Sequence, residues 1–248
     1  MSHGYSAMLT SLSLALLSMA TSENPANSLS KKYLRISLCQ FIVTPDKSYN
    51  IRKAKEFICK GKENGADLVI LPECWNSPYS TSKFHEYAEI IDGNSISEDA
   101  CPSVFMLSNI SKEKGLWIIG GSVPEREGNK LYNTCVIFNP NGQIVGKHRK
   151  IHLFDIDVPG RIKFKESDAL SAGNSPTIFE TPWGKIGVGI CYDLRFPELA
   201  LLMRSLDCFL LVYPGAFNMV TGNISNCHAT QKCPDHNTDK NKDVYFVS

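Results

Sequence analysis

The hydrophobic and polar positions between residues 33 and 213 predict strands and helices that follow one another along the chain. Short apolar runs bounded by polar residues are typical of strands, and they cover residues 34–41, 68–71, 116–120 and 209–213. Apolar residues at helical spacing predict helices over residues 50–65, 104–114 and 199–206. The first helix ends on Gly65, which we expect to be its C-cap.

Two turn motifs predict hairpins within the same region. Pro140-Asn141-Gly142 separates the extended runs 131–139 and 143–147. Pro182-Trp183-Gly184 separates the runs 177–180 and 185–190 in the same way. Strands that alternate with helices, together with hairpins, indicate an α/β fold with mixed sheets.

The bulk composition fits a soluble globular protein of one domain with tails. The chain has 248 residues, of which 43% are hydrophobic and 21% are charged. A formal net charge of +1 gives no reason to expect a nucleic acid or an acidic membrane as a partner. The nine cysteines are odd in number and lack regular spacing, which indicates free thiols in a reducing compartment.

Residues 1–32 differ from the rest and form an N-terminal extension. Residues 1–30 contain no Lys or Arg and no acid before Glu23, and residues 8–20 are apolar and Ser-rich. A stretch of about thirteen residues is too short to cross a bilayer. Secretory signals normally carry a charged start and transit peptides are normally Arg-rich, and neither feature is present. A cleavable signal, a transit peptide and a disordered extension therefore stay open.

Cys191 is the first candidate for chemistry. The apolar run 186–190 predicts a buried strand that ends on this cysteine, and a helical stretch follows at 198–206. A thiol where a strand gives way to a helix can be held rigidly, with backbone N–H groups facing a developing negative charge. This placement suits a nucleophile, although most cysteines are small buried hydrophobic residues.

Glu73 is the second candidate, because the strand predicted over 68–71 ends abruptly on Pro72-Glu73. A partly buried carboxylate at the carboxyl end of a strand is a usable general base. The same position also suits a glutamate that caps a neighbouring helix.

Lys150 is the third candidate, at the end of the basic run 147–150. Such a run is usually a solvated face. The apolar residues and the Asp-Ile-Asp at 155–157 that follow favour a loop folded inward, which would place the lysine ammonium near a reacting oxygen.

Glu73, Lys150 and Cys191 together resemble the Glu-Lys-Cys triad of the nitrilase-like carbon–nitrogen hydrolases. Blocks around them narrow the resemblance to the omega-amidase branch, and they cover residues 71–79, 119–125, 131–135, 148–160, 189–200 and 212–218. The resemblance implies an αββα sandwich over residues 33–222, in which two such units usually pair sheet to sheet.

The resemblance also implies a mechanism that needs no metal and no organic cofactor. Glu73 would take the proton of Cys191 as the thiol attacks an amide carbon, and Lys150 would stabilise the oxyanion with a backbone N–H beside the cysteine. Ammonia would leave, and water activated by Glu73 would release the acid from a thioester. Glu166 matches a further glutamate beside the lysine, although from the residues alone it resembles a surface glutamate in a charged loop.

The implied partners are small amides, namely omega-amides of α-keto dicarboxylates such as α-ketoglutaramate and α-ketosuccinamate. Tyr79, Tyr192 and Arg195 are the candidate substrate-binding residues, with Arg195 and Tyr79 available for the ligand's carboxylate. Arg195 could equally be a structural partner of Asp193 or Glu198. An amidase for another small amide, such as deaminated glutathione, is an alternative, since it shares the 189–200 block.

The resemblance ends at about residue 222. Residues 223–248 form a polar, divergent tail in which only 244–247 suggests a strand, where the family continues with a helix and further strands. We therefore expect an incomplete hydrolase domain with exposed apolar surface. A catalytically inactive isoform that binds full-length subunits is the alternative function. The family forms homodimers, and whether this chain does so stays open. The family favours the cytosol or the mitochondrion, with a secretory signal not excluded.

Several other polar residues are assigned no chemistry. We assign no zinc site, because the spacing of Cys227, His228, Cys233 and His236 is poor for one. We interpret Cys74 as a packing residue and His148 and His152 as structural. Residues 96–101 resemble a short surface insertion.

Overall fold

The structure is a computed structural model, and it describes residues 13–17, 33–93, 95–160, 162–216, 231–233 and 244–247. Its helices are α1 (Lys47–Glu63), α2 (Phe84–Tyr87), α3 (Pro102–Lys114) and α4 (Pro197–Ser205), with the 3-10 helices η1 (Glu166–Asp168) and η2 (Cys191–Arg195). Its strands are β1 (Ser13–Leu17), β2 (Leu34–Leu38), β3 (Leu68–Ile70), β4 (Trp117–Ile119), β5 (Val123–Glu127), β6 (Lys130–Phe138), β7 (Ile144–Arg149), β8 (Asp155–Val158), β9 (Ile162–Lys165), β10 (Thr177–Thr181), β11 (Gly184–Val188), β12 (Cys208–Val212), β13 (Gln231–Cys233) and β14 (Val244–Val247).

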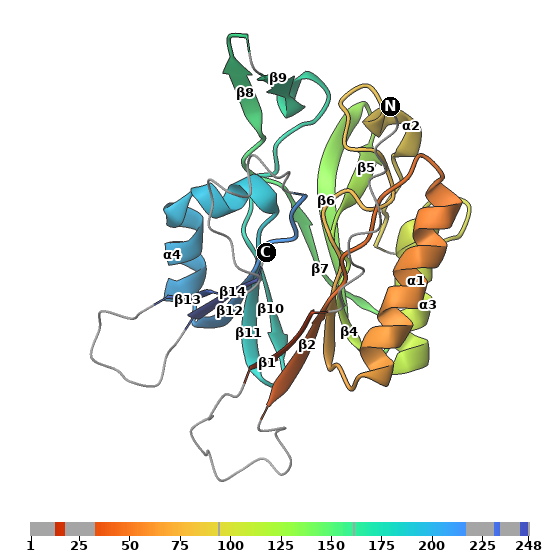
Figure 1. Cartoon of the computed structure of the whole chain (residues 1–248), viewed down its shortest axis with the longest axis vertical. Helices are drawn as coiled ribbons and strands as arrows, with labels where there is room; N and C mark the ends of the chain where they lie inside the picture. The colour runs from red at the N-terminus through yellow and green to blue at the C-terminus, as the bar shows by residue number, and fades with distance from the viewer. Residues whose placement is uncertain are drawn as a thin grey trace, which may run out of the picture.

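The strands form two mixed sheets and a separate ribbon. The first sheet has the order β1-β2-β3-β4-β6-β5, with β7 paired to β6, and the second has the order β10-β11-β12-β14-β13. Strands β2, β3 and β4 are parallel, whereas β4 and β6 are antiparallel. The two sheets lie face to face, with α1 and α3 outside the first and α4 outside the second (Figure 1). This confirms the α/β fold with mixed sheets that the sequence pattern predicts and the αββα sandwich that the family resemblance implies.

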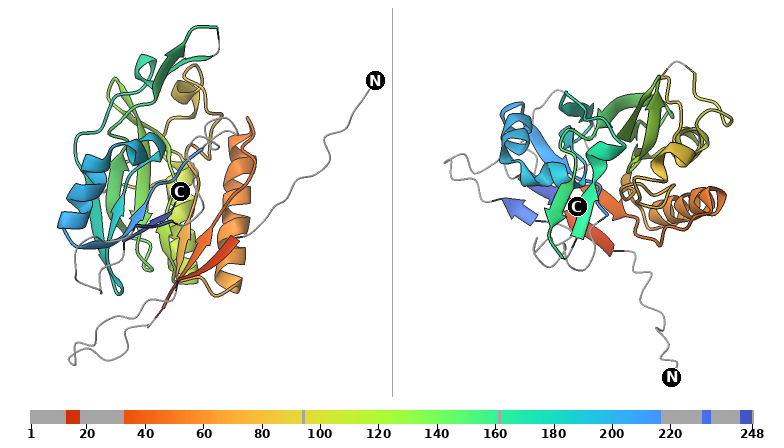
Figure 2. Two further views of the ribbon diagram at one scale, coloured as in Figure 1. Left: turned by 60° about the vertical axis from the view of Figure 1, so that its left-hand side comes forward. Right: turned by 90° about the horizontal axis from the view of Figure 1, so that it is seen from above.

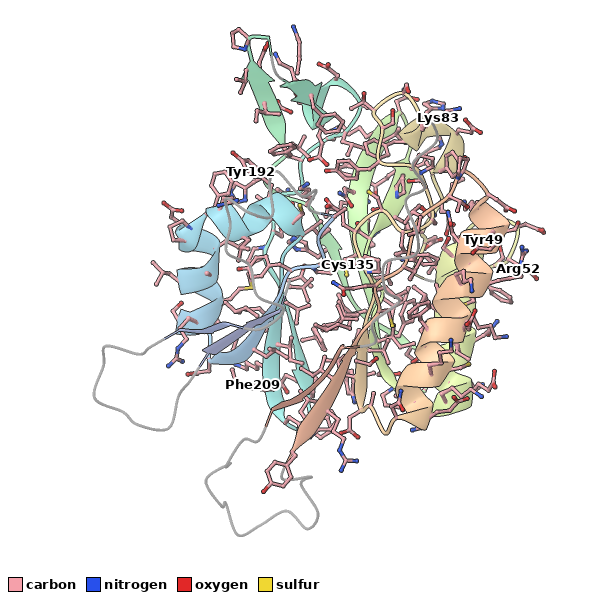
Figure 3. The ribbon with its side chains drawn as sticks, in the orientation of Figure 1. Tyr49, Arg52, Lys83, Cys135, Tyr192 and Phe209 are labelled. Atoms are coloured by element: carbon pink, nitrogen blue, oxygen red, sulfur yellow. The ribbon has the colours of Figure 1, made fainter. Side chains whose placement is uncertain are left out.

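Apolar side chains of both sheets fill the space between them. The buried cluster there draws on β2, β3, β4 and β6 from one sheet and on β10, β11 and β12 from the other. Cys135 of β6 belongs to it and lies between the sheets (Figure 3). A second cluster joins α1 and α3 to the outer face of the first sheet, and a third joins α4 to the second. Burial of these faces is the main force that stacks the four layers.

The two predicted hairpins are present. Strands β6 and β7 are antiparallel, as are β10 and β11. Gly142 in the first turn has φ +78°, and a Cβ there would lie 2.6 Å from the Ser108 carbonyl oxygen. Only glycine fits this turn without strain.

Helix α1 begins and ends differently from the prediction. It begins at Lys47, because the side chain of Asp46 caps it by accepting the Tyr49 N–H at 2.9 Å. It ends at Glu63, with Asn64 as its C-cap, so the assignment of Gly65 as the cap is wrong by one residue. Gly65 follows with φ +82° and redirects the chain.

The sequence analysis expected the segment after Lys150 to be a loop folded inward. In the structure, Lys150 is buried, but the segment that follows it is not such a loop. Asp155 and Asp157 lie on β8, which pairs with β9 in an antiparallel ribbon that projects from the body (Figures 1 and 2). Both aspartates are exposed. Charged and apolar residues alternate along β8 and β9, so the two aspartates face water while Phe164 of β9 stacks on Tyr79 with centroids 5.6 Å apart.

Residues 96–101 are not only a surface insertion. Cys101 is fully buried, and Ile96 packs against the cluster under α1 and α3. The apolar ends of this segment therefore belong to the core, although Glu98 and Asp99 between them are exposed.

Both terminal regions contribute strands. Strand β1, within the N-terminal extension, pairs antiparallel with β2 and was not predicted. The expected strand at 244–247 is confirmed as β14, which pairs parallel with β12 and antiparallel with β13. Cys227, His228 and His236 lie outside the described residues. Among the described helices, none has both the length and the apolar character that a bilayer span requires.

Candidate active site

Three strands of two different sheets deliver the three candidate residues to one place. Glu73 follows β3, Lys150 directly follows β7, and Cys191 follows β11 as the first residue of η2. Each side chain thus comes from the chain just beyond the carboxyl end of a strand; β3 is fully buried, whereas β7 is mostly half-buried or exposed. Rigid strands hold side chains more precisely than loops do, which suits a reactive site.

Glu73 is the most heavily hydrogen-bonded of the three. Its Oε1 accepts from Lys150 Nζ at 3.0 Å and from Asn133 Nδ2 at 2.9 Å. Its Oε2 accepts from the Ala216 backbone N–H at 3.0 Å. The carboxyl also shares a hydrogen bond with the Cys191 thiol, which in turn contacts the Ala216 N–H. The carboxylate therefore lies between the ammonium and the sulfur.

Lys150 is fully buried and lies between two carboxylates. Its Nζ is 3.0 Å from Glu73 Oε1 and 2.9 Å from Glu166 Oε2. Burial works against the charge on its ammonium, but the negative charges of Glu73 and Glu166 outweigh burial and raise the pKa of Lys150. The lysine is therefore a fixed cation.

Glu166 is buried and touches the lysine, so it is not a surface glutamate in a charged loop. Its Oε2 also accepts the Phe154 N–H at 2.6 Å, at the base of the β8–β9 ribbon. Burial raises the pKa of Glu166, the charge of Lys150 opposes this, and the charge of Glu73 adds to it. Glu166 thus ties the ribbon to the ammonium.

Cys191 has an unusual backbone and a largely neutral thiol. Its φ of +46° lies in the left-handed region, which is uncommon for any residue but glycine. Its N–H donates to the Pro214 carbonyl oxygen at 2.9 Å. Burial and the negative charge of Glu73 raise the pKa of the Cys191 thiol well above its ordinary value, and Lys150 offsets only part of this. The thiol needs a base before it can attack.

Asn133 is the residue at this site that sequence reasoning missed. It lies on β6, is buried, and donates to Glu73 across 60 positions of the chain. Its carbonyl oxygen also accepts the Lys150 N–H at 2.8 Å. The signal in the sequence is an asparagine inside a largely apolar strand, next to Thr134, but that signal does not say which group the asparagine contacts.

Of the three candidate substrate-binding residues, Tyr79 contacts this cluster directly, whereas Tyr192 and Arg195 lie on η2. The Tyr79 hydroxyl donates to Glu166 Oε1 at 2.5 Å and lies 3.4 Å from Lys150 Nζ. Tyr192 packs its ring against Phe154, with centroids 5.1 Å apart. It lies on η2, above α4 and below the ribbon (Figure 3). Arg195, the last residue of η2, is exposed.

Asp193 organises the backbone around Cys191. It is fully buried, its Oδ2 accepts the Ile190 N–H at 2.9 Å and lies 3.2 Å from His148 Nε2, and its Oδ1 lies 2.7 Å from His152 Nδ1. Burial would raise the pKa of Asp193, but the hydrogen bonds and charge of His148 and the backbone N–H groups hold it below its ordinary value. The two histidines thus hold η2 in place.

Cys74 lies next to Glu73 in the chain but faces elsewhere. Cys74 is 2% exposed and packs with Phe84, Leu131 and Leu170. Burial raises the pKa of the Cys74 thiol well above the ordinary value. Within the described ranges, no group of three or more His, Cys, Asp or Glu side chains could hold a metal ion.

The sequence matches the model of one known family. The model of the family described as "Carbon-nitrogen hydrolase" matches residues 35–233. The chain belongs to the carbon–nitrogen hydrolase family. Relatives in that family support the omega-amidase branch: Omega-amidase NIT2 of Xenopus tropicalis is 56% identical over 188 residues, 76% of this chain and 65% of the relative. The chloroplastic omega-amidase of Arabidopsis thaliana is 55% identical over 198 residues, 80% of this chain and 52% of the relative.

A solved structure agrees with the fold. The crystal structure of Saccharomyces cerevisiae Nit3, a member of branch 10 of the nitrilase superfamily, has a TM-score of 0.65 and 42% identity. The match covers 73% of this chain and 64% of that one. The chain thus spans somewhat less than two thirds of the length of these relatives.

Proposed function

We propose that this protein is an omega-amidase that releases ammonia from the terminal amide of an α-keto dicarboxylate monoamide, such as α-ketoglutaramate. One observation carries the proposal: the Glu73 carboxylate bonds both the Lys150 ammonium, at 3.0 Å, and the Cys191 thiol. A base, a fixed cation and a nucleophile that touch one another are the groups that amide cleavage through a thioester needs. The omega-amidase relatives support the choice of substrate class.

Acylation begins when Glu73 takes the thiol proton as sulfur attacks the amide carbon. The neutral thiol of Cys191 makes this base necessary. The amide oxygen becomes an oxyanion, and the Lys150 ammonium lies where it can stabilise that charge. The N–H of Cys191 itself donates to Pro214, so we assign the second donor to the backbone N–H of Tyr192.

Collapse of the tetrahedral species breaks the carbon–nitrogen bond. Glu73 returns its proton to the nitrogen, ammonia leaves, and the acyl group stays on sulfur as a thioester. Glu73 then takes a proton from water, whose hydroxide attacks the thioester carbon. The thiolate leaves and regains that proton, which restores the starting site.

Glu166 and Tyr79 keep the ammonium in place. The Tyr79 hydroxyl gives its proton to Glu166, so it is less suited to donate to a substrate carboxylate. Two carboxylates beside Lys150 also repel a third. We therefore propose that Arg195 binds the substrate carboxylate and that Tyr192 forms a wall of the site.

The test is ammonia release by the purified chain from α-ketoglutaramate, with Cys191→Ala as the blank. Turnover by the wild type alone supports the proposal. Faster turnover of deaminated glutathione than of α-ketoglutaramate would show that the substrate is a different small amide. The absence of turnover on both amides would favour an inactive isoform and overturn the proposal for this chain.

A further inference from the structure

We propose that Asn133 is a positioning residue that holds Glu73 so that its Oε2, and not its Oε1, takes the Cys191 proton. The inference deepens the proposed function and rests on it for the reaction, but its geometry stands on hydrogen bonds within the described residues. The contact that carries it is the 2.9 Å bond from Asn133 Nδ2 to Glu73 Oε1.

The two oxygens of Glu73 have different surroundings. Oε1 accepts from the Lys150 ammonium at 3.0 Å and from the Asn133 amide at 2.9 Å. A carboxylate oxygen offers about two lone pairs, so these donors occupy Oε1. Oε2 accepts only the Ala216 N–H, at 3.0 Å, among the contacts of the described residues. Its remaining lone pair is the place for a proton.

The Ala216 N–H links the base to the nucleophile. It donates to Glu73 Oε2 at 3.0 Å and also hydrogen-bonds the Cys191 thiol. Because Oε2 and the thiol share this donor, we infer that the sulfur lies on the Oε2 side of the carboxylate. The proton therefore has a short path from sulfur to Oε2.

Asn133 contacts both the base and the residue that carries the cation. Its Nδ2 donates to Glu73 Oε1 at 2.9 Å, whereas its buried Oδ1 accepts no hydrogen bond from the described residues. Its backbone oxygen accepts the Lys150 N–H at 2.8 Å, so this one residue positions both the base and the cation.

The proton balance follows from this arrangement. The S–H bond breaks, Oε2–H forms, and sulfur bonds the amide carbon. When the carbon–nitrogen bond breaks, the Oε2 proton moves to nitrogen and leaves with ammonia. Throughout, Asn133 and Lys150 keep their bonds to Oε1, so the carboxylate does not rotate.

The test compares Asn133→Leu with Asn76→Leu. Asn76 is a matched control, because it is also buried, donates to a buried carboxylate, Glu89, at 3.2 Å, and leaves its Oδ1 unpartnered among the described residues. Both changes remove one amide from a carboxylate. Only Asn133 touches the base of the proposed reaction.

The first measurement needs no substrate. Iodoacetamide alkylates thiolates, and its rate at Cys191 is followed by mass spectrometry of the tryptic peptide 186–195, in which Cys191 is the one cysteine. We expect Asn133→Leu to slow this alkylation about 10- to 100-fold at neutral pH, because Glu73 loses the donor that fixes its orientation towards the thiol; the range is that of a hydrogen bond to a charged group. Asn76→Leu should stay within about twofold, because its partner is Glu89. Equal rates in the two variants would overturn the proposal.

The second measurement uses the conservative variant Asn133→Asp. The introduced carboxyl can donate to Glu73 when it is protonated, whereas it repels Glu73 when it is ionised. We expect alkylation and kcat to recover towards the wild-type values at acidic pH and to fall near neutrality, with KM nearly unchanged. A wild-type pH profile would contradict the proposal.

The two proposals fail in different ways. If the wild type releases no ammonia but its Cys191 alkylation depends on Asn133, the positioning holds and the substrate assignment fails. If the wild type turns over amides and Asn133→Leu keeps the wild-type kcat, the positioning role is wrong and the amidase assignment stands.

Discussion

Lys150 Nζ lies 3.0 Å from Glu73 Oε1, and neither side chain is exposed to solvent. A buried ion pair is costly to assemble and far more costly to leave half made. Glu166, at 2.9 Å from the same nitrogen, gives this cation two anions. The two carboxylates therefore carry more negative charge than the Lys150 ammonium can neutralise.

Replacement of the cation should unfold the site. We expect Lys150→Met to lower the free energy of unfolding by about 3–5 kcal/mol, because two carboxylates lose their buried partner. The double variant with Glu166→Gln should regain part of that loss, since one uncompensated charge disappears. Urea unfolding at neutral pH measures both. Lys53, a partly exposed lysine paired with Glu56 at 2.9 Å, is the control, and Lys53→Met should leave the midpoint unchanged. A Lys150→Met variant as stable as this control would show that the pair does not matter.

Replacement of the base should remove turnover without unfolding the chain. We expect Glu73→Gln to lower kcat by about 10²- to 10⁴-fold, because the neutral thiol keeps its proton. Glu125 is a matched buried carboxylate outside the site, bonded to Lys147 at 2.7 Å and to Arg149 at 2.8 Å. Glu125→Gln should cost stability but retain kcat in the ammonia assay. Equal losses of kcat in the two variants would argue against a general base at residue 73.

The backbone of Cys191 predicts a difference between two inactive variants. Its φ of +46° strains any side chain but suits glycine. Cys191→Gly should therefore be more stable than Cys191→Ala by about 1 kcal/mol, although glycine also frees the unfolded chain. Thermal unfolding compares them directly. A more stable alanine variant would mean that the left-handed conformation is not kept in solution.

Asp193 should contribute to stability only above acidic pH. Its pKa lies below the ordinary value of 3.8, so its contribution is fully present above that value and is lost as pH falls through the lower, folded value. The groups that face it are His148, His152 and the Ile190 N–H. Asp193→Asn should lower stability at pH 7 and weaken its decline below about pH 4.

Urea unfolding between pH 7 and pH 3 tests this dependence. Asp157→Asn, an exposed position on β8, is the control and should keep the wild-type slope. If Asp193→Asn keeps that slope as well, the acid sensitivity arises elsewhere.

Local sequence was enough for elements whose pattern is set by neighbours in the chain. The β6–β7 hairpin follows from Pro140-Asn141-Gly142. Helix α1 follows from its apolar spacing, although it begins at Lys47 instead of Asn50 and its C-cap is Asn64 instead of Gly65. Strands β8 and β9 were missed because they have no continuous apolar run: charged and apolar residues alternate over only four positions in each. So short an alternation is a weak signal for a strand.

The sequence by itself indicated an α/β fold with mixed sheets and named Glu73, Lys150 and Cys191, because strand ends are local features. Its resemblance to a known family added the αββα sandwich and Glu166. Only the tertiary structure decided that Asn133 and Lys150 share Glu73 Oε1, while Ala216 meets Oε2. These contacts join residues 60, 77 and 143 positions apart in the chain. Such distances depend on how two sheets stack and in which register their strands pair, and burial of the apolar core between the sheets sets both.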